Sequence, residues 1–162
     1  MINVPIQLTK QLEIQEGLRL TAYWDNIGNV WTIGYGHTGS DVYSGLTITQ
    51  EQAQSFLDAD IRVAAADLEK HLPWTSNLTV IRKCALVNQT FNMGIGGVLE
   101  FHEELSAIQN EDWEETVLAM RESLWYRQVP NRVNAIAYQL YFNEWASGYL
   151  TAEQTDKLNA SI

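Results

Sequence analysis

EGLRLTAYWDNIGNVWTIGYGH, residues 16–37, is the stretch in which a helical sequence pattern gives way to a sheet pattern. Before it, Leu8 and Leu12 stand one helical turn apart and a helix-ending glycine follows, which predicts a short helix over residues 6–16. Beyond it, β-branched and aromatic residues alternate with glycines. This pattern predicts a small antiparallel sheet with tight turns over residues 22–46.

Helical patterns fill the rest of the chain. Thr49 and Gln52 form a capping box that begins a helix over residues 49–70, where apolar residues recur at three- and four-residue spacing. Further helices are predicted over residues 80–92, 98–110 and 113–122, from Pro130, and from a second capping box at Thr151. We therefore predict one domain of α+β class, with a small mixed lobe, a long connecting helix and a larger helical lobe.

Composition and charge restrict the class of protein. Twenty acidic against ten basic residues give a net charge of −10, which argues against nucleic acid as a partner. No stretch is apolar enough for a membrane helix, and the N-terminus lacks the pattern of a signal peptide. Cys84 is the only cysteine and reads as a buried apolar side chain within a helix. We therefore expect a protein folded inside the cell, without stable membrane association.

Seven acidic residues stand close together without a lysine or arginine among them. They are Glu100, Glu103, Glu104, Glu111, Asp112, Glu114 and Glu115. A solvated acidic helix face is the preferred interpretation over a binding surface.

Three other patterns do not predict a site. Residues 34–39 match the letters of a dinucleotide-binding glycine motif, but no helical pattern follows them, so tight turns explain the glycines better. The three histidines lack the spacing of metal ligands to one another. Neither a serine nor Cys84 stands in a nucleophile elbow. We therefore predict no metal and no cofactor.

Two carboxylates offer a different chemistry. Glu16 ends the first predicted helix, and Asp25 lies in the turn-rich entry to the sheet. Glycoside hydrolysis needs such a pair, because one carboxyl group donates a proton to the leaving oxygen while the other works in its ionised form. Spacing alone also fits a surface charge beside a helix-end carboxylate.

Two longer blocks resemble the phage-type lysozymes, also called endolysins (glycoside hydrolase family 24). The first contains Glu16-Gly17-Leu18-Arg19-Leu20, Tyr23, Asp25 and the run from Trp31 to His37. The second contains the run from Arg82 to Asn88, Phe91, Met93-Gly94, Trp113, the run from Ser123 to Tyr126, and Pro130-Asn131-Arg132. Together the matches extend from about residue 8 to residue 145, and a lysozyme-like fold is what they imply.

The resemblance also implies roles for the site residues. Glu16 would be the general acid, Asp25 the carboxylate that activates water, and Thr32 the hydroxyl that helps to hold this water in an inverting reaction. Arg132 would support the site by pairing with Glu16. His37 and Asp60 would support it by pairing with each other. Residues lining the sugar cleft would be Phe91, Asn92 and Thr38.

A His37–Asp60 ion pair would raise the pKa of the histidine and lower that of the aspartate. The sequence departs from the family elsewhere. Six residues separate Asp25 from Thr32, one more than in the family pattern, and the chain is acidic where its T-even relatives are basic. Residues after Trp145 have no counterpart in the resemblance.

The predicted protein is a single lysozyme domain over residues 1–162. Its parts would be a small catalytic lobe (13–58), the connecting helix (49–70) and a helical lobe (71–162 with 1–12). Its expected function is hydrolysis of the β-1,4 bond between N-acetylmuramic acid and N-acetylglucosamine of peptidoglycan glycan strands, by a monomer, for host lysis. It would be made in the host cytoplasm and act in the periplasm after membrane permeabilisation. A lytic transglycosylase and a non-catalytic wall-binding or virion protein remain the alternatives.

Overall fold

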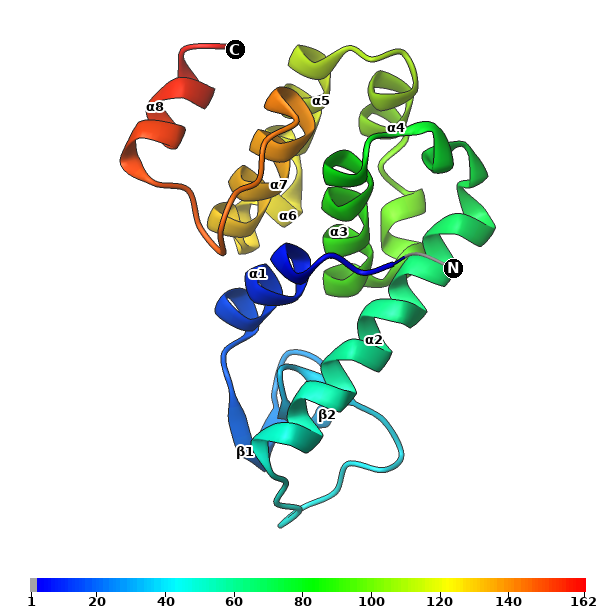
Figure 1. The fold of residues 1–162 in the computed structure, drawn as a ribbon, viewed down its shortest axis with the longest axis vertical. Coiled ribbons are helices and arrows are strands. Elements are labelled where there is room, and N and C mark those ends of the chain that lie inside the picture. Colours follow the sequence, from blue (N-terminus) through cyan, green and yellow to red (C-terminus); the bar gives the residue numbers. More distant parts are fainter. Residues whose placement is uncertain (1–2) are drawn as a thin grey trace.

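The computed structural model describes residues 3–162 and contains a small sheet and a larger group of helices (Figure 1). In chain order its elements are α1 (Ile6–Glu16), β1 (Arg19–Asp25), β2 (Val30–Gly34), β3 (His37–Thr38), α2 (Gln50–His71), a 3₁₀ turn (Pro73–Asn77), α3 (Val80–Leu99), α4 (His102–Gln109), α5 (Trp113–Glu122), α6 (Leu124–Gln128), α7 (Pro130–Phe142) and α8 (Ala152–Asn159). This arrangement confirms the predicted α+β, lysozyme-like class. No helix among these residues is long and apolar enough to cross a membrane.

The sheet is antiparallel, in the order β1-β2-β3, and smaller than predicted. It begins at Arg19 and its last strand ends at Thr38, while residues 39–46 form a loop instead of a strand. The turn from β2 to β3 needs Gly34 and Gly36, whose φ angles of 65° and 82° are unfavourable for other residues. The glycine-rich motif is therefore a strand-to-strand turn, as the sequence indicated.

α2 runs from the sheet to the other helices, as Figure 1 shows. The predicted capping box is present, since Thr49 Oγ1 accepts a hydrogen bond from the Gln52 backbone N–H and the Gln52 side chain accepts one from Thr49. The start predicted for the helix over residues 98–110 is wrong. α3 bends at Gly94, where φ is 75°, and then continues to Leu99, so α4 begins only at His102.

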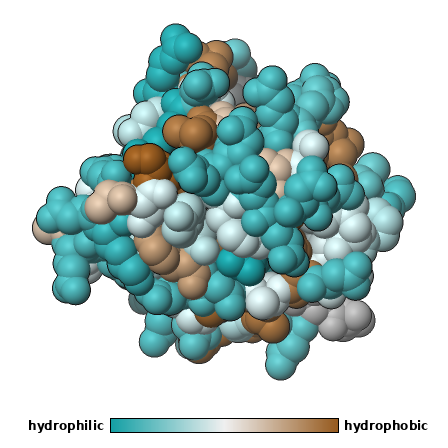
Figure 2. Space-filling view, turned by 90° about the horizontal axis from the view of Figure 1, so that it is seen from above, coloured by the Kyte–Doolittle hydropathy of each residue, from teal (hydrophilic) through white to brown (hydrophobic). Residues whose placement is uncertain are grey.

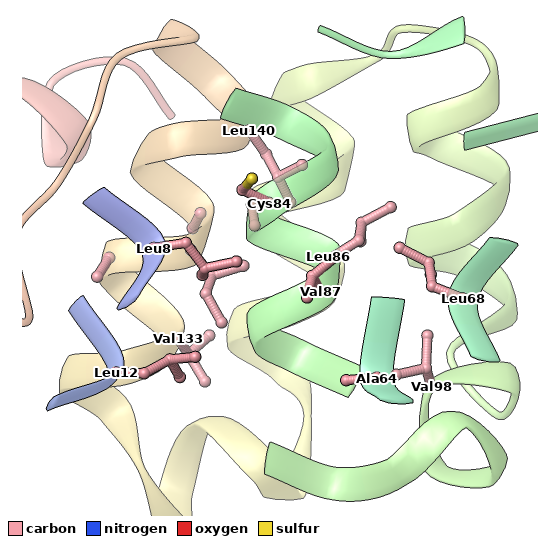
Figure 3. Packing of buried hydrophobic residues seen from close by; sticks show 14 of the residues in the cluster. Leu8, Leu12, Ala64, Leu68, Cys84, Leu86, Val87, Val98, Val133 and Leu140 are labelled. Carbon is pink, nitrogen blue, oxygen red and sulfur yellow. The ribbon is translucent and has the colours of Figure 1, made fainter. Parts of the chain in front are cut away.

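The hydrophobic core lies among the helices, and residues of α1 belong to it (Figure 3). Leu8 and Leu12 of α1 are buried in the same cluster as Cys84, Val133 and Leu140. α1 therefore packs with the helical group although the chain passes next into the sheet. The burial predicted for Cys84 is confirmed, and this burial raises the pKa of its thiol to about 11.

Hydrophilic residues cover most of the surface at the helical end, where hydrophobic residues form only small separate areas (Figure 2). The acidic run is not uniformly solvated, however. Glu103 is exposed, but Glu104 is 1% exposed and accepts a hydrogen bond from Gln89 Nε2 at 3.2 Å. The interpretation of the run as a solvated face is thus wrong for Glu104, because α4 turns this side chain toward α3.

Candidate active site

Glu16, the last residue of α1, has its two carboxylate oxygens in different surroundings. Oε1 accepts a hydrogen bond from Arg132 Nη2 of α7 at 2.6 Å. Oε2 faces the turn between β2 and β3, where a Cβ atom on Gly36 would lie 2.8 Å from it. Arginine thus fixes one oxygen, and the absence of a side chain at Gly36 leaves room beside the other. The predicted pairing of Arg132 with Glu16 is present.

Buried amides hold α1 in this position. The Gln11 side chain donates to Gln139 Oε1 of α7, and Asn88 Nδ2 of α3 donates to the side-chain oxygens of Gln11 and Gln15, both at 2.9 Å. Buried polar groups that find partners resist displacement, because separation would leave each group unpaired. The end of α1, and with it Glu16, is therefore tied to the two helices that it crosses.

Asp25 and Thr32 lie on the same face of the sheet. Thr32 is directly opposite Tyr23 in the register of β1 and β2, and Tyr23 and Asp25 are two positions apart in one strand. Such diagonal neighbours are about 7–8 Å apart. Asp25 Oδ1 accepts a hydrogen bond from the Ile27 backbone N–H at 2.9 Å, and the turn over residues 26–29 accommodates the additional residue of this hairpin.

A cavity of about 220 Å³ lies between the sheet, α2 and α3. Thr38, Asp60 and Phe91 line it, so two of the three predicted sugar-cleft residues come together there. The third, Asn92, is next to Phe91 in the chain, but its side-chain oxygen accepts a hydrogen bond from Trp125 Nε1 at 2.7 Å. We call this space the cleft cavity. A larger hollow, about 620 Å³, lies between the start of α1 and α2 and contains neither Glu16 nor Asp25.

His37 has two acidic partners where the resemblance implied one. Its Nδ1 is 2.8 Å from Asp60 Oδ2, its Nε2 is 3.2 Å from Asp41 Oδ2, and its ring stacks on Phe56 at 4.2 Å between centroids. Burial lowers the pKa of His37, but the hydrogen bonds and charges of Asp60 and then Asp41 outweigh it, so the pKa is raised.

The direction predicted for Asp60 is wrong. Burial raises the pKa of its carboxyl group more than hydrogen bonding and charge from His37 lower it, so the net shift is upward. The lowered pKa belongs instead to the exposed Asp41, chiefly because of the hydrogen bond with His37. Asp41 was missed in the sequence because it follows the last strand in a loop without a regular pattern.

His37→Asn is expected to destabilise the protein more at pH 6 than at pH 9. A histidine with a raised pKa contributes stability that is present below its unfolded value of 6.5 and is lost as the pH rises through the folded value. Hydrogen bonds to charged groups suggest a cost of about 2 kcal/mol at pH 6. Urea unfolding across this range measures it, with exposed His71→Asn as the control. A cost that does not change with pH would contradict the charged pair.

The arrangement places one carboxyl group against an arginine and a second carboxylate on a neighbouring sheet face beside a hydroxyl. Carboxyl groups and hydroxyls are the kinds of group that general acid–base catalysis uses. Among residues 3–162 no three histidine, cysteine, aspartate or glutamate side chains are grouped so that they could hold a metal ion. The sequence did not single out Gly36, which makes room for Glu16, because a glycine in a turn carries no sign of what lies opposite.

Comparison with known proteins identifies the family of the chain. The phage lysozyme family model matches residues 13–139. The chain is 31% identical over 158 residues to the pre-baseplate central spike protein Gp5 of Enterobacteria phage T4, which covers 83% of this chain but only 27% of that protein. It is 29% identical over 150 residues to the "Probable T4-type lysozyme 1" of Dictyostelium discoideum, covering 77% of this chain and 88% of that protein.

A third relative has a higher identity over a shorter length. An endolysin of Acyrthosiphon pisum secondary endosymbiont phage 1 is 43% identical over 82 residues, or 49% of this chain and 52% of that protein. The family model covers Glu16, both strands of the hairpin and most of the helices, ending within α7. On this match the chain belongs to the phage lysozyme family.

Proposed function

We propose that this chain is a peptidoglycan hydrolase that cleaves the β-1,4 bond between N-acetylmuramic acid and N-acetylglucosamine with inversion at the anomeric carbon. The observation that carries the proposal is the carboxyl group of Glu16, held through one oxygen by Arg132 and open at the other beside Gly36. Membership of the phage lysozyme family supports the same class of substrate.

In the proposed reaction, Glu16 gives its proton to the glycosidic oxygen as the bond from that oxygen to the anomeric carbon breaks. A water molecule attacks the same carbon from the opposite face, and Asp25 accepts the proton that this water releases. The Thr32 hydroxyl, on the sheet face that Asp25 shares, would hold the water. Arg132 keeps the Glu16 side chain in one orientation and is a positioning residue.

The proposed setting is host lysis by a monomer that needs no cofactor. The protein would be made in the host cytoplasm and would reach the periplasm once the inner membrane is permeabilised. With a net charge of −10, long-range attraction to an anionic wall is not available to it. Recognition must therefore come from short-range contacts in the cleft.

Digestion of purified Gram-negative peptidoglycan tests this function. The expected products are muropeptides with free reducing N-acetylmuramic acid ends, identified by mass spectrometry. NMR early in the reaction should show the α-anomer first if the configuration is inverted. Anhydro-muramic ends would identify a lytic transglycosylase instead. No products at all would favour a non-catalytic wall-binding or virion protein, a role to which the similarity to a phage spike protein gives some support.

A further inference from the structure

The segment between α7 and α8 returns to α1 before the last helix begins, as Figure 1 shows. We call residues 143–151 the C-terminal strap. It lies beyond the family match, which stops at residue 139, so the match gives it no role. Ala146 of the strap is 4% exposed and belongs to the hydrophobic core. The strap is therefore a fixed part of the helical group, and it lies beside the helix that carries Glu16.

Side-chain amides of α1 are bonded to the backbone of the strap. Gln11 Nε2 donates to the backbone oxygens of Ala146 and Ser147, at 3.2 and 3.1 Å. Gln15 Nε2 donates to the backbone oxygen of Gly148 at 2.9 Å. Because carbonyl groups can only accept hydrogen bonds, the nitrogen end of each amide must face the strap. Three consecutive strap residues thus bind α1.

The oxygen ends of the same two side chains face α3. Asn88 Nδ2 donates to Gln11 Oε1 and to Gln15 Oε1, both at 2.9 Å. The two glutamines are four positions apart, so they lie on one face of α1. Burial of the leucines of this helix has no preferred direction, whereas hydrogen bonds are directional. The strap and α3, together with the bond to α7 described above, therefore set the rotation of α1 about its own axis.

Gly148 brings the strap into direct contact with α1. A Cβ atom on Gly148 would lie 2.1 Å from Cγ2 and 2.5 Å from Cβ of Ile14, which is closer than real atoms approach. The φ angle of Gly148 is not in the positive range, so space and not backbone conformation requires glycine here. The strap reaches hydrogen-bonding distance of Gln15 because this position carries no side chain.

The rotation of α1 decides where Glu16 lies. Glu16 follows Gln15 directly and is the last residue of the helix, and Gly17, with a φ angle of 68°, turns the chain toward the sheet. A rotation of α1 would separate Glu16 Oε1 from Arg132 Nη2, which it now meets at 2.6 Å. Arg132 is buried on α7, so its guanidinium group is not free to follow. A misplacement of about 1 Å in a catalytic group can cost about 10²-fold in rate.

We propose that the C-terminal strap positions Glu16 for the reaction, acting through Gln11 and Gln15. The strap holds α1 at the rotation in which the Glu16 carboxyl group meets Arg132. The two glutamines and Gly148 are thus positioning residues, which act through Glu16 and not on the substrate. This role rests on the proposed function, in which Glu16 is the general acid, and it predicts an effect on kcat more than on KM.

Gly148→Ala tests this role, because the added methyl group pushes the strap away from Ile14 and takes the backbone acceptors away from the two glutamines. With soluble glycan fragments as substrate, kcat should fall about 10- to 100-fold while KM changes little. Adding Ile14→Gly removes the atoms that the methyl group meets and should restore most of kcat. Gln15→Ala, which breaks one bond to the strap without a steric clash, should lower kcat in the same way but less.

Thr151→Ala is the matched control, because it weakens the end of the strap without touching α1. Thr151 Oγ1 accepts a hydrogen bond from the Gln154 backbone N–H and caps α8. Its loss should lower the melting temperature and leave kcat unchanged. Wild-type kcat in folded Gly148→Ala would overturn the positioning role. An equal loss of kcat in Gly148→Ala and Thr151→Ala would overturn it too, because the effect would then follow stability alone.

An NMR measurement separates this role from the proposed function. In protein with isotope-labelled arginine, the Arg132 side-chain N–H group that Glu16 binds should exchange slowly with water, and Arg132→Lys assigns its signal. Exchange should become faster in Gly148→Ala but not in Thr151→Ala, and unchanged exchange would overturn the positioning role. Absence of cleavage by the wild type would overturn the proposed function alone, because the exchange rates would still decide whether the strap holds Glu16 against Arg132.

Discussion

Glu16→Gln is expected to lower the rate of peptidoglycan cleavage by about 10²- to 10⁴-fold, the range that a positioned general acid contributes. The amide has the shape of the carboxyl group but carries no proton that it can give to a leaving oxygen. Its carbonyl oxygen can still accept the hydrogen bond from Arg132 Nη2 that Glu16 Oε1 accepts at 2.6 Å. The substitution thus removes the proposed chemistry and keeps the contact that holds the side chain.

Glu13→Gln in the same helix is the matched control, because Glu13 lies one turn earlier and faces the hollow between α1 and α2. Both variants should keep the circular dichroism spectrum of the wild type. Release of reducing ends, measured at several enzyme concentrations, should fall only in Glu16→Gln. Activity of folded Glu16→Gln within a few-fold of wild type would remove Glu16 from the role of acid.

Local signals in the sequence predicted local structure well. A capping box needs only residues three positions apart, and the one at Thr49 is formed as expected, as is the second at Thr151. The burial of Leu8 and Leu12 on one side of α1 also follows from spacing alone. A helix that ends at residue 92 was predicted, but α3 bends at Gly94 and continues to Leu99, because periodicity cannot tell a bend from an end.

Contacts distant in the chain could not be predicted in the same way. Arg132 and Glu16 are 116 positions apart, and only the family resemblance suggested that they pair. The hydrogen bonds from Gln11 to the backbone oxygens of Ala146 and Ser147 span still more of the chain, and no resemblance suggested them. Glutamine carries no sequence signal for burial, since its partner decides whether its amide can leave water.

The acidic run also shows that sequence alone does not predict which residues of one type are buried. Glu103 and Glu104 are both glutamates and neighbours in α4. The packing of α4 on α3 leaves Glu103 exposed but buries Glu104. Glu104 Oε1 and Gln89 Oε1 are both buried and have no hydrogen-bond partner among the described residues. Burial raises the pKa of Glu104 to about 8, against the smaller lowering effect of its hydrogen bond from Gln89.

Glu104→Gln is therefore expected to make the protein more stable than wild type at pH 8, and the difference should be small below pH 4.5. Between pH 4.5 and 8 the Glu104 carboxyl group is ionised in the unfolded state, where its pKa is the ordinary 4.5. In the folded state it keeps its proton over the same interval. Wild-type stability thus falls by about 1.4 kcal/mol per pH unit, or roughly 5 kcal/mol over the interval. The amide is neutral throughout, and its N–H group can donate to Gln89 Oε1.

Urea unfolding of wild type, Glu104→Gln and Glu103→Gln between pH 4.5 and 8.5 measures this effect. Glu103 is the exposed neighbour on the same helix, so its substitution should leave the pH dependence of the unfolding free energy close to that of wild type. Glu104→Gln should flatten it. Parallel curves for all three proteins would mean that Glu104 ionises in the folded protein as readily as in the unfolded one. The polar pair between α3 and α4 would then be open to water, and not part of the closed core that the helices form around it.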